Sequence, residues 1–175
     1  MITVIAGKYK GRKLSFIKNV SVRPTQAKVK KSIFDILGNL DGKIVLDLYC
    51  GVGGFGIEAL SRGAKELSLV EKNPKVFKIL LKNISQICVD DQIKLHRIDV
   101  EKFINMNKKK FDLIFVDPPY GEFDFLRLMQ ITSKFLFKDG ILCMEMKKNR
   151  IFDNIENIRI KHYGSTQVIF WKKIT

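Results

Sequence analysis

The sequence contains few of the residues from which metal sites and disulfide frameworks are built. Its 175 residues include 3 cysteines and 2 histidines. Cys50, Cys88 and Cys143 lie far apart and form no Cys-x-x-Cys pair, which argues against structural zinc and for a reducing compartment. His96 and His162 are equally isolated. We therefore expect no metal site.

Long apolar runs and acidic residues are also scarce. No stretch is apolar enough to span a bilayer, and residues 1–6 have neither a basic leader nor a signal-like core; we therefore expect a cytoplasmic protein with no membrane partner. The sequence has only 18 acidic residues but 32 lysines and arginines, which gives a formal net charge of +14. Such a charge attracts polyanions, and nucleic acid is the first candidate. A solvated, lysine-rich surface is the other explanation.

The order of apolar runs and turn residues predicts one domain with a short N-terminal extension. Residues 2–16 predict a β-hairpin with a basic tip at 7–13. Thr25 follows as a candidate N-cap for a helix at 26–37. We expect residues 1–40 to form this extension, as an RNA contact and cofactor lid, and residues 41–175 to form the main domain.

From residue 43 onward, strands and helices alternate. The pattern predicts strands at 44–49, 67–71, 93–98, 111–116 and 140–146, with helices between them. Two further strands, 158–163 and 167–171, are too close for a helix to separate them, so they must pair antiparallel. The predicted fold is α/β: a doubly wound, mostly parallel sheet closed by one antiparallel hairpin.

A glycine-rich turn, Gly51-x-Gly53-x-x-Gly56, follows the first of these strands and opens a helix. Such a turn exposes backbone amides to a ligand at a helix N-terminus. Glu71 ends the next strand, where a carboxylate can accept hydrogen bonds from both ribose hydroxyls. These features fit a dinucleotide and S-adenosylmethionine equally well.

Asp47 separates the two cofactors. It lies a few residues before the glycines, where an ionised carboxylate would repel a pyrophosphate but attract the sulfonium and ammonium groups of S-adenosylmethionine. In a partly shielded site the sign of that interaction is worth roughly several kcal/mol before desolvation. Asp99, after the third strand, fits two roles: an acceptor for the adenine 6-amino group, or the cap of a helix beginning near Glu101.

Asp117-Pro118-Pro119-Tyr120 follows the apolar strand at 111–116. Consecutive prolines donate no backbone hydrogen bonds and hold the chain extended. The Asp117 carboxylate and Pro118 carbonyl supply two acceptors, and Tyr120 supplies a flat stacking surface. This combination suits a base with an exocyclic amino group, although a rigid turn with a packed tyrosine would have the same four residues.

These motifs together resemble the RsmD-type methyltransferases, and the similarity runs nearly end to end. The resemblance is carried by Val4–Leu14, Arg23-Pro24-Thr25, Leu46–Gly56, Glu58–Ala64, Val70-Glu71, Asp117–Tyr120 and Tyr163–Val168. That family methylates the 2-amino group of a guanine in 16S ribosomal RNA of the small subunit.

The resemblance implies a Rossmann-like class I fold with a seven-stranded sheet, S-adenosylmethionine as the cofactor, and 16S rRNA or the small ribosomal subunit as the partner of a monomeric enzyme. The catalytic residues would be Asp117, Pro118 and Tyr120. The cofactor-binding residues would be Arg23, Thr25, Asp47, Gly51, Gly53, Glu71 and Asp99. Arg23 would pair with the methionine carboxylate; a phosphate contact or a helix-entry role is its alternative.

Basic residues near the N-terminus are the candidates for RNA contact. They are Lys8, Lys10, Arg12 and Lys13 on the hairpin and Lys28 and Lys31 on the first helix. Lys30-Lys31 also departs from the family, whose members often carry Arg-Glu at this point. Two other functions fit parts of the pattern: an adenine-N6 methyltransferase acting on DNA or RNA, and a non-catalytic nucleic-acid-binding module. A nicotinamide-dependent oxidoreductase is disfavoured by Asp47.

Overall fold

The computed structural model describes residues 2–16, 27–118, 125–148 and 155–174. Strands and helices alternate along most of the chain, as the sequence predicts. Their bounds are β1 Ile2–Thr3, β2 Lys13–Leu14, α1 Ala27–Leu37, β3 Ile44–Leu48, α2 Gly54–Ser61, β4 Glu66–Val70, α3 Pro74–Ile87, β5 Gln92–His96, α4 Val100–Met106, β6 Phe111–Val116, α5 Phe125–Ser133, β7 Leu136–Lys147, β8 Ile158–Tyr163 and β9 Thr166–Lys172.

Among the described residues, the main sheet has seven strands in the order β5-β4-β3-β6-β7-β9-β8. β5, β4, β3, β6 and β7 are parallel, whereas β9 is antiparallel to both of its neighbours. β1 and β2 form a separate antiparallel pair. The prediction of a parallel sheet closed by an antiparallel hairpin is confirmed, as is the N-terminal hairpin.

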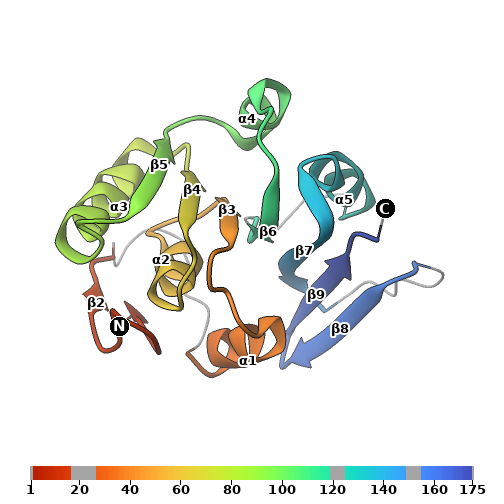
Figure 1. Cartoon of the computed structure of the whole chain (residues 1–175), viewed down its shortest axis with the longest axis horizontal. Helices are drawn as coiled ribbons and strands as arrows, with labels where there is room; N and C mark the ends of the chain where they lie inside the picture. Colours follow the sequence, from red (N-terminus) through yellow and green to blue (C-terminus); the bar gives the residue numbers. More distant parts are fainter. Residues whose placement is uncertain (1, 17–26, 119–124, 149–154, 175) are drawn as a thin grey trace.

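Helices cover both faces of the sheet (Figure 1). α1, α2 and α3 pack on one face and α4 and α5 on the other, which gives two separate apolar clusters. Successive residues of a strand point to opposite faces. In β3, Val45 belongs to the first cluster and Leu46 and Leu48 to the second, so Asp47 lies on the face that α1 and α2 cover.

β7 begins at Leu136, earlier than the predicted strand at 140–146. Phe111 pairs with Leu136, and the register then shifts before Leu113 pairs with Ile141. Asp139 has a positive φ of 63°. The Asp-Gly pair at 139–140, which in a sequence suggests a turn, here lies within one strand at an irregularity in the ladder.

Two helix ends carry residues that suit the positions they occupy. Asn73 caps α3 by accepting hydrogen bonds from the amides of Lys75 and Val76, with Pro74 in the first turn. Gly63, after the end of α2, has a φ of 102°, as expected of a C′ residue.

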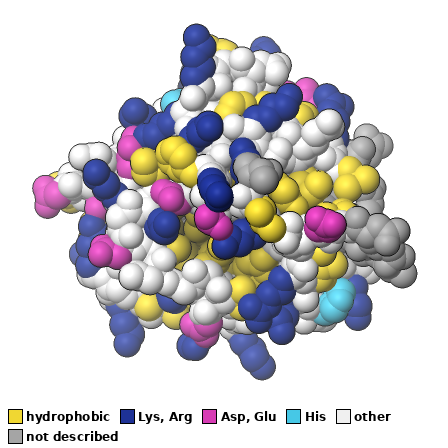
Figure 2. Space-filling model, turned by 45° about the vertical axis from the view of Figure 1, so that its right-hand side comes forward, with side chains coloured by type: hydrophobic (Ala, Val, Ile, Leu, Met, Phe, Trp, Pro, Cys, Tyr) yellow, Lys and Arg dark blue, Asp and Glu magenta, His cyan; other side chains and the backbone are white. Residues whose placement is uncertain are grey.

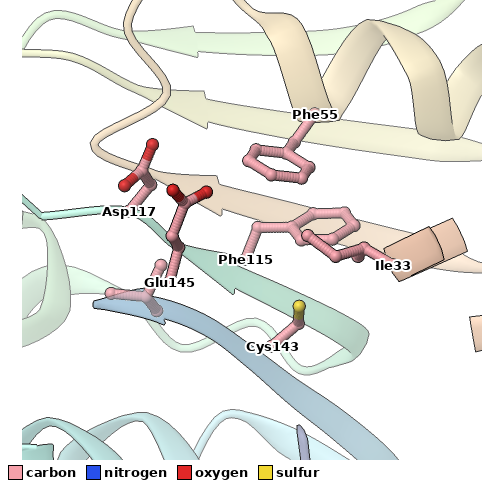
Figure 3. A pocket seen from close by; sticks show the side chains of 7 residues that line it. Ile33, Phe55, Phe115, Asp117, Cys143 and Glu145 are labelled. Carbon is pink, nitrogen blue, oxygen red and sulfur yellow. The ribbon is translucent and has the colours of Figure 1, made fainter. Parts of the chain in front are cut away.

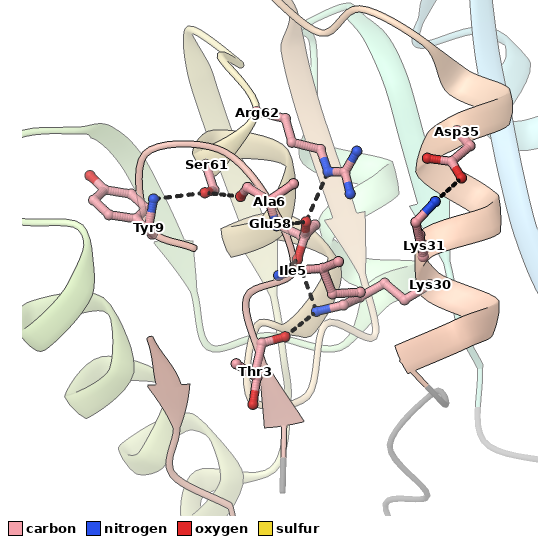
Figure 4. Close-up of polar contacts among 10 residues, drawn as sticks. All are labelled: Thr3, Ile5, Ala6, Tyr9, Lys30, Lys31, Asp35, Glu58, Ser61 and Arg62. Atoms are coloured by element: carbon pink, nitrogen blue, oxygen red, sulfur yellow. Dashed lines mark hydrogen bonds and ion pairs between the residues drawn. The ribbon is translucent and has the colours of Figure 1, made fainter. Parts of the chain in front are cut away.

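A buried ionic cluster ties the N-terminal segment and α1 to α2 (Figure 4). The Glu58 side chain is fully buried, and its carboxylate accepts from the amides of Ile5 and Ala6 at 2.7 and 3.1 Å. It also pairs with Lys30 Nζ at 3.1 Å and Arg62 Nε at 2.8 Å. One carboxylate therefore holds three segments that are distant in sequence.

Candidate active site

Three carboxylates lie on adjacent strands near the carboxyl edge of the sheet. Asp47 lies near the end of β3, Asp117 follows β6, and Glu145 lies near the end of β7. Val116 pairs with Met144 across the ladder, so Asp117 and Glu145 are the next residues on neighbouring parallel strands. By strand alternation both lie on the face covered by α1 and α2, the same face as Asp47.

Asp117 and Glu145 form the polar side of a small pocket whose other walls are apolar. The pocket is lined by Ile33, Phe55, Phe115, Val116, Asp117, Cys143 and Glu145. In Figure 3 the two carboxylates lie next to each other on one side of it, and the rings of Phe55 and Phe115 lie on the other. These two rings are stacked, with centroids 5.0 Å apart and an interplanar angle of 22°.

The pocket disfavours negative charge on Asp117. Burial raises the pKa of Asp117 well above its usual range, and the nearby carboxylates of Glu145 and Asp47 raise it further. Acids brought together in an apolar site retain protons until a cation or a hydrogen-bond donor compensates their charge. The pocket is therefore suited to a ligand that brings positive charge or N–H donors.

The turn between β3 and α2 depends on left-handed backbone conformations. Tyr49 and Gly51 have φ values of 58° and 55°, and Gly53 has 92°. The Gly53 amide donates to the Cys50 carbonyl at 2.9 Å. A Cβ atom on Gly53 would lie 2.8 Å from Leu80 Cδ1. This close, strained turn brings the backbone amides at the start of α2 next to Asp47.

Asp47 is buried, and only part of its hydrogen-bonding capacity is used. Its Oδ2 accepts from the Gly56 amide at 2.9 Å, whereas Oδ1 has no hydrogen-bond partner among the described residues. Burial raises the pKa of Asp47 to about 7, the Gly56 amide lowers it, and the Glu71 carboxylate raises it. A buried acceptor of this kind is normally satisfied, so Oδ1 is a suitable contact for a cationic or N–H-bearing ligand.

Glu71 and Asp99 follow the neighbouring strands β4 and β5. Glu71 accepts from the Gly51 amide at 3.2 Å and from the Asn73 amide at 2.7 Å. Asp99 caps α4 by accepting from the Glu101 amide at 3.0 Å, and it pairs with Lys72. Burial acts to raise the pKa of Asp99, but these bonds leave it below its usual value. The helix-cap role is thus present; the adenine contact stays a prediction.

The structure describes only some of the other predicted site residues. Pro118 is buried, and the Asp117 amide lies 3.5 Å from the Leu48 carbonyl, which ties the start of the Asp-Pro-Pro-Tyr motif to β3. Arg23, Thr25 and Tyr120 lie outside the described residues. Their roles stay predictions.

The predicted RNA-binding residues are largely exposed but lie in two places. Lys28 and Lys31 are on α1, the helix whose Ile33 lines the pocket. The hairpin tip instead contacts the end of α2, where the Lys8 amide donates to the Ser61 carbonyl at 2.8 Å. α2 starts at the carboxyl edge of the sheet and ends at its amino edge, so the tip lies away from the pocket.

Two of the hairpin cations have partners within the chain. The ammonium of Lys8 bonds to Asp91, and the guanidinium of Arg12 bonds to the Gln86 carbonyl. Lys10 and Lys13 are exposed on the same hairpin. Figure 2 shows lysine and arginine side chains spread over the visible face of the molecule rather than gathered in one patch. RNA contact by any of the six residues stays a prediction.

Glu145 was not among the residues predicted from the sequence. A signal was present: the apolar run of residues 141–144 ends in this acidic residue, as the run of residues 113–116 ends in Asp117. Parallel strands of one sheet end at the same edge, so a comparison of the ends of these two apolar runs could have identified Asp117 and Glu145 as neighbours.

The described part of the chain offers neither a metal centre nor a membrane-spanning helix. It contains no group of three or more His, Cys, Asp or Glu side chains arranged to hold a metal ion. None of its helices has the length and apolar character needed to cross a membrane.

The comparisons with known proteins identify counterparts over almost the whole chain. Residues 2–172 match the family model described as "Conserved hypothetical protein 95". YlbH of Bacillus subtilis, provisionally described as an rRNA methyltransferase, is 34% identical over 97% of this chain and 98% of its own length. Ribosomal RNA small subunit methyltransferase D of Haemophilus influenzae is 32% identical over 98% of this chain and 92% of its own length.

Solved structures show the same architecture. A hypothetical protein of Thermus thermophilus is 25% identical, with a TM-score of 0.84 over 98% of this chain and 99% of the other. A 16S rRNA N2 methyltransferase of the same organism, solved with AdoMet and guanosine, is 18% identical, with a TM-score of 0.71 over 89% of this chain and 44% of the other. The second likeness is one of fold.

Proposed function

The chain belongs to the conserved hypothetical protein 95 family, the RsmD-type methyltransferases, and from this membership we propose that it transfers a methyl group from S-adenosylmethionine to the exocyclic 2-amino group of a guanine in 16S rRNA. The observation that carries the proposal is the position of Asp117, a carboxylate that follows a buried strand and lines an apolar pocket. The named relatives act on ribosomal RNA, which does not favour the adenine-N6 alternative or a non-catalytic module.

The residues around the glycine turn suit S-adenosylmethionine. When bound, this cofactor supplies a methyl group on a positively charged sulfur. The unpartnered Oδ1 of Asp47 fits its ammonium group, and the Gly51–Gly53 turn leaves no room for a side chain at Gly53. Glu71 follows β4 beside this turn, where its carboxylate can accept from the ribose hydroxyls. We assign these residues to the cofactor site together with Arg23, Thr25 and Asp99.

Asp117 and the Pro118 carbonyl would hold the amino group for transfer. The 2-amino nitrogen of guanine is a weak nucleophile because its lone pair is delocalised into the ring. Two acceptors for its N–H bonds align the nitrogen with the methyl group and favour tetrahedral geometry. Positive charge develops on the nitrogen during transfer, and the adjacent Asp117 carboxylate stabilises it. Tyr120 would stack on the base, a contact worth roughly 1–3 kcal/mol.

We extend the proposal to the roles of the two parts of the chain, the oligomeric state and the cellular location. We propose that residues 1–40 contribute RNA contact and the cofactor lid, with residues 41–175 forming the catalytic domain. We also propose that the protein acts as a monomer in the cytoplasm. The exposed basic residues on α1 and the hairpin support an RNA partner through their charge.

Nucleoside mass spectrometry of 16S rRNA tests the proposed function. In cells lacking this protein we expect one N2-methylguanosine to disappear, and in purified RNA or small subunits from those cells we expect the protein and S-adenosylmethionine to restore it. An unchanged set of methylated guanosines would contradict the proposal. A lost N6-methyladenosine would favour the adenine alternative.

We expect cofactor affinity to depend on pH through Asp47. Its pKa is raised to about 7, and a cationic ligand stabilises the ionised form, so binding lowers this pKa and releases a proton. Affinity should rise as the pH increases towards about 7 and level off above it. Isothermal titration in buffers of different ionisation enthalpy would measure the proton released. Asp47→Asn should release fewer protons than the parent chain; an equal release would assign the effect to another group, such as Asp117.

A further inference from the structure

We propose that Glu145 reads the N1–H of the target guanine and so selects guanine over bases whose N1 is an acceptor. This inference rests on the proposed function and assigns a residue to the recognition of the base. Asp117 would hold the amino group that is methylated, and Glu145, next to it in the pocket, would hold the neighbouring donor of the same base edge.

The position of Glu145 supports this role. Asp117 and Glu145 follow directly after the paired residues Val116 and Met144 on two hydrogen-bonded parallel strands, so their side chains emerge beside each other. Both line the pocket, and Figure 3 shows their carboxylates side by side, opposite the aromatic rings. Both therefore lie on one side of the carboxyl edge of the sheet, where the Watson–Crick edge of a base, rather than the whole base, would meet them.

The residue types along this face of the sheet also support a role for Glu145 in recognising a ligand. One step back on the same strands and the same face are Phe115 and Cys143, which are 1% and 3% exposed and belong to the apolar core. The face then changes from apolar to acidic within one pair of residues. Acidic groups placed together raise the pKa of Asp117, which burial already raises, and perturbed carboxyl groups in a pocket are typical of functional sites.

The hydrogen-bonding pattern of guanine complements two adjacent carboxylates. Its Watson–Crick edge presents the N1–H donor beside the 2-amino group, so two neighbouring acceptors can each receive a hydrogen bond from it. Adenine presents an unprotonated N1 at the corresponding place, and a carboxylate facing that lone pair would be repelled. A site built to pair with a donor discriminates strongly against analogues that lack it.

A base analogue separates recognition of N1–H from the chemistry of the amino group. 2-Aminopurine keeps the reactive 2-amino group but has an acceptor at N1. Two short rRNA substrates would be compared, one with guanine and one with 2-aminopurine at the position found by mass spectrometry. We expect the native chain to prefer guanine in kcat/KM by at least about tenfold, in line with the discrimination that a well-placed base contact gives.

Glu145→Gln should remove most of that preference. A glutamine amide can accept from N1–H or donate to an unprotonated N1, so the guanine to 2-aminopurine ratio should fall at least about fivefold, with the cofactor dissociation constant within a few-fold of the native value. Glu156→Gln, the same change at an exposed position before β8, is the matched control and should leave the ratio unchanged.

The outcomes separate this inference from the proposed function. If the native chain methylates no guanine in rRNA, the proposed function fails. If it methylates guanine but accepts 2-aminopurine equally well, the assignment of Glu145 is overturned without any variant. A native preference that Glu145→Gln retains in full would also overturn it.

Discussion

Asp117→Ala is expected to reduce methyl transfer by about 10³-fold while the dissociation constant for S-adenosylmethionine stays within a few-fold. In the proposed mechanism the carboxylate stabilises the positive charge that develops on the amino nitrogen, and removal of one such preorganised group costs about 10²–10³ in kcat. Loss of the acceptor also misaligns the nitrogen, which adds to the effect. Cofactor binding should be preserved because the proposed cofactor contacts of Asp47 and the glycine turn remain. Methyl incorporation into rRNA and titration calorimetry would measure the two quantities separately.

Asp112→Ala provides the matched control for this experiment. Asp112 lies on the same strand, β6, but near its other end, where it accepts from the Ile44 amide at 2.8 Å and faces Lys43. Its removal should lower stability modestly and leave the turnover of folded protein unchanged. Normal turnover by Asp117→Ala would refute the assigned role, and equal loss in both variants would indicate damage to the sheet.

Glu58→Ala is expected to destabilise the fold by about 3–5 kcal/mol, the usual cost of removing one partner of a buried ion pair. The substitution leaves Lys30, whose side chain is 5% exposed, without its anion. Burial already lowers the pKa of Lys30, and Glu58 opposes that shift. The amides of Ile5 and Ala6 would also lose their acceptor. In a chain of this length, the loss corresponds to a fall in Tm of about 6–20 °C.

The exposed carboxylate of Asp35 provides a control for Glu58→Ala. Asp35 pairs with Lys31 on the surface of α1 at 2.8 Å, with side chains 52% and 63% exposed, and such pairs contribute about 0–1 kcal/mol. Asp35→Ala should therefore hardly shift the urea midpoint, whereas Glu58→Ala should shift it strongly. Similar midpoints for the two variants would show that the buried cluster does not hold the hairpin and α1 in place.

The parallel core of the fold could be predicted because its central strands, β3, β4 and β6, are buried on both faces. Such strands appear in the sequence as continuous apolar runs bounded by turn residues, and the predicted bounds of β6 match the structure to the residue. β7 was predicted too short because the local turn signal at Asp139 and Gly140 outweighed the pairing that carries the strand through it. The strands that pair with β7 are distant from it in the sequence, so no local sequence pattern reveals the pairing.

The residues of the candidate site differ in the same way: some are indicated by the local sequence, and others depend on contacts between distant segments. Asp47, Glu71 and Asp117 could be proposed as site residues because each lies at the end of a recognisable strand. Glu145 follows its apolar run in the same way, but its meaning depends on the register between β6 and β7, which one chain does not display. Glu58 could not be found either, since a glutamate in a helix is usually exposed, and only the packing of the N-terminal segment buries it.

The antiparallel strand inserted between β7 and β8 has a consequence for the order in which the site forms. β7 pairs with β6 on one side and with β9, residues 166–172, on the other. During vectorial synthesis the strand that carries Glu145 therefore has an unpaired edge until the part of the chain at residues 166–172 has been made. Val168, which pairs with Glu145 in register, arrives within that part. Until β9 is made, β7 has one unpaired edge and β8 has no partner among the described strands, and unpaired strand edges are open to wrong pairing.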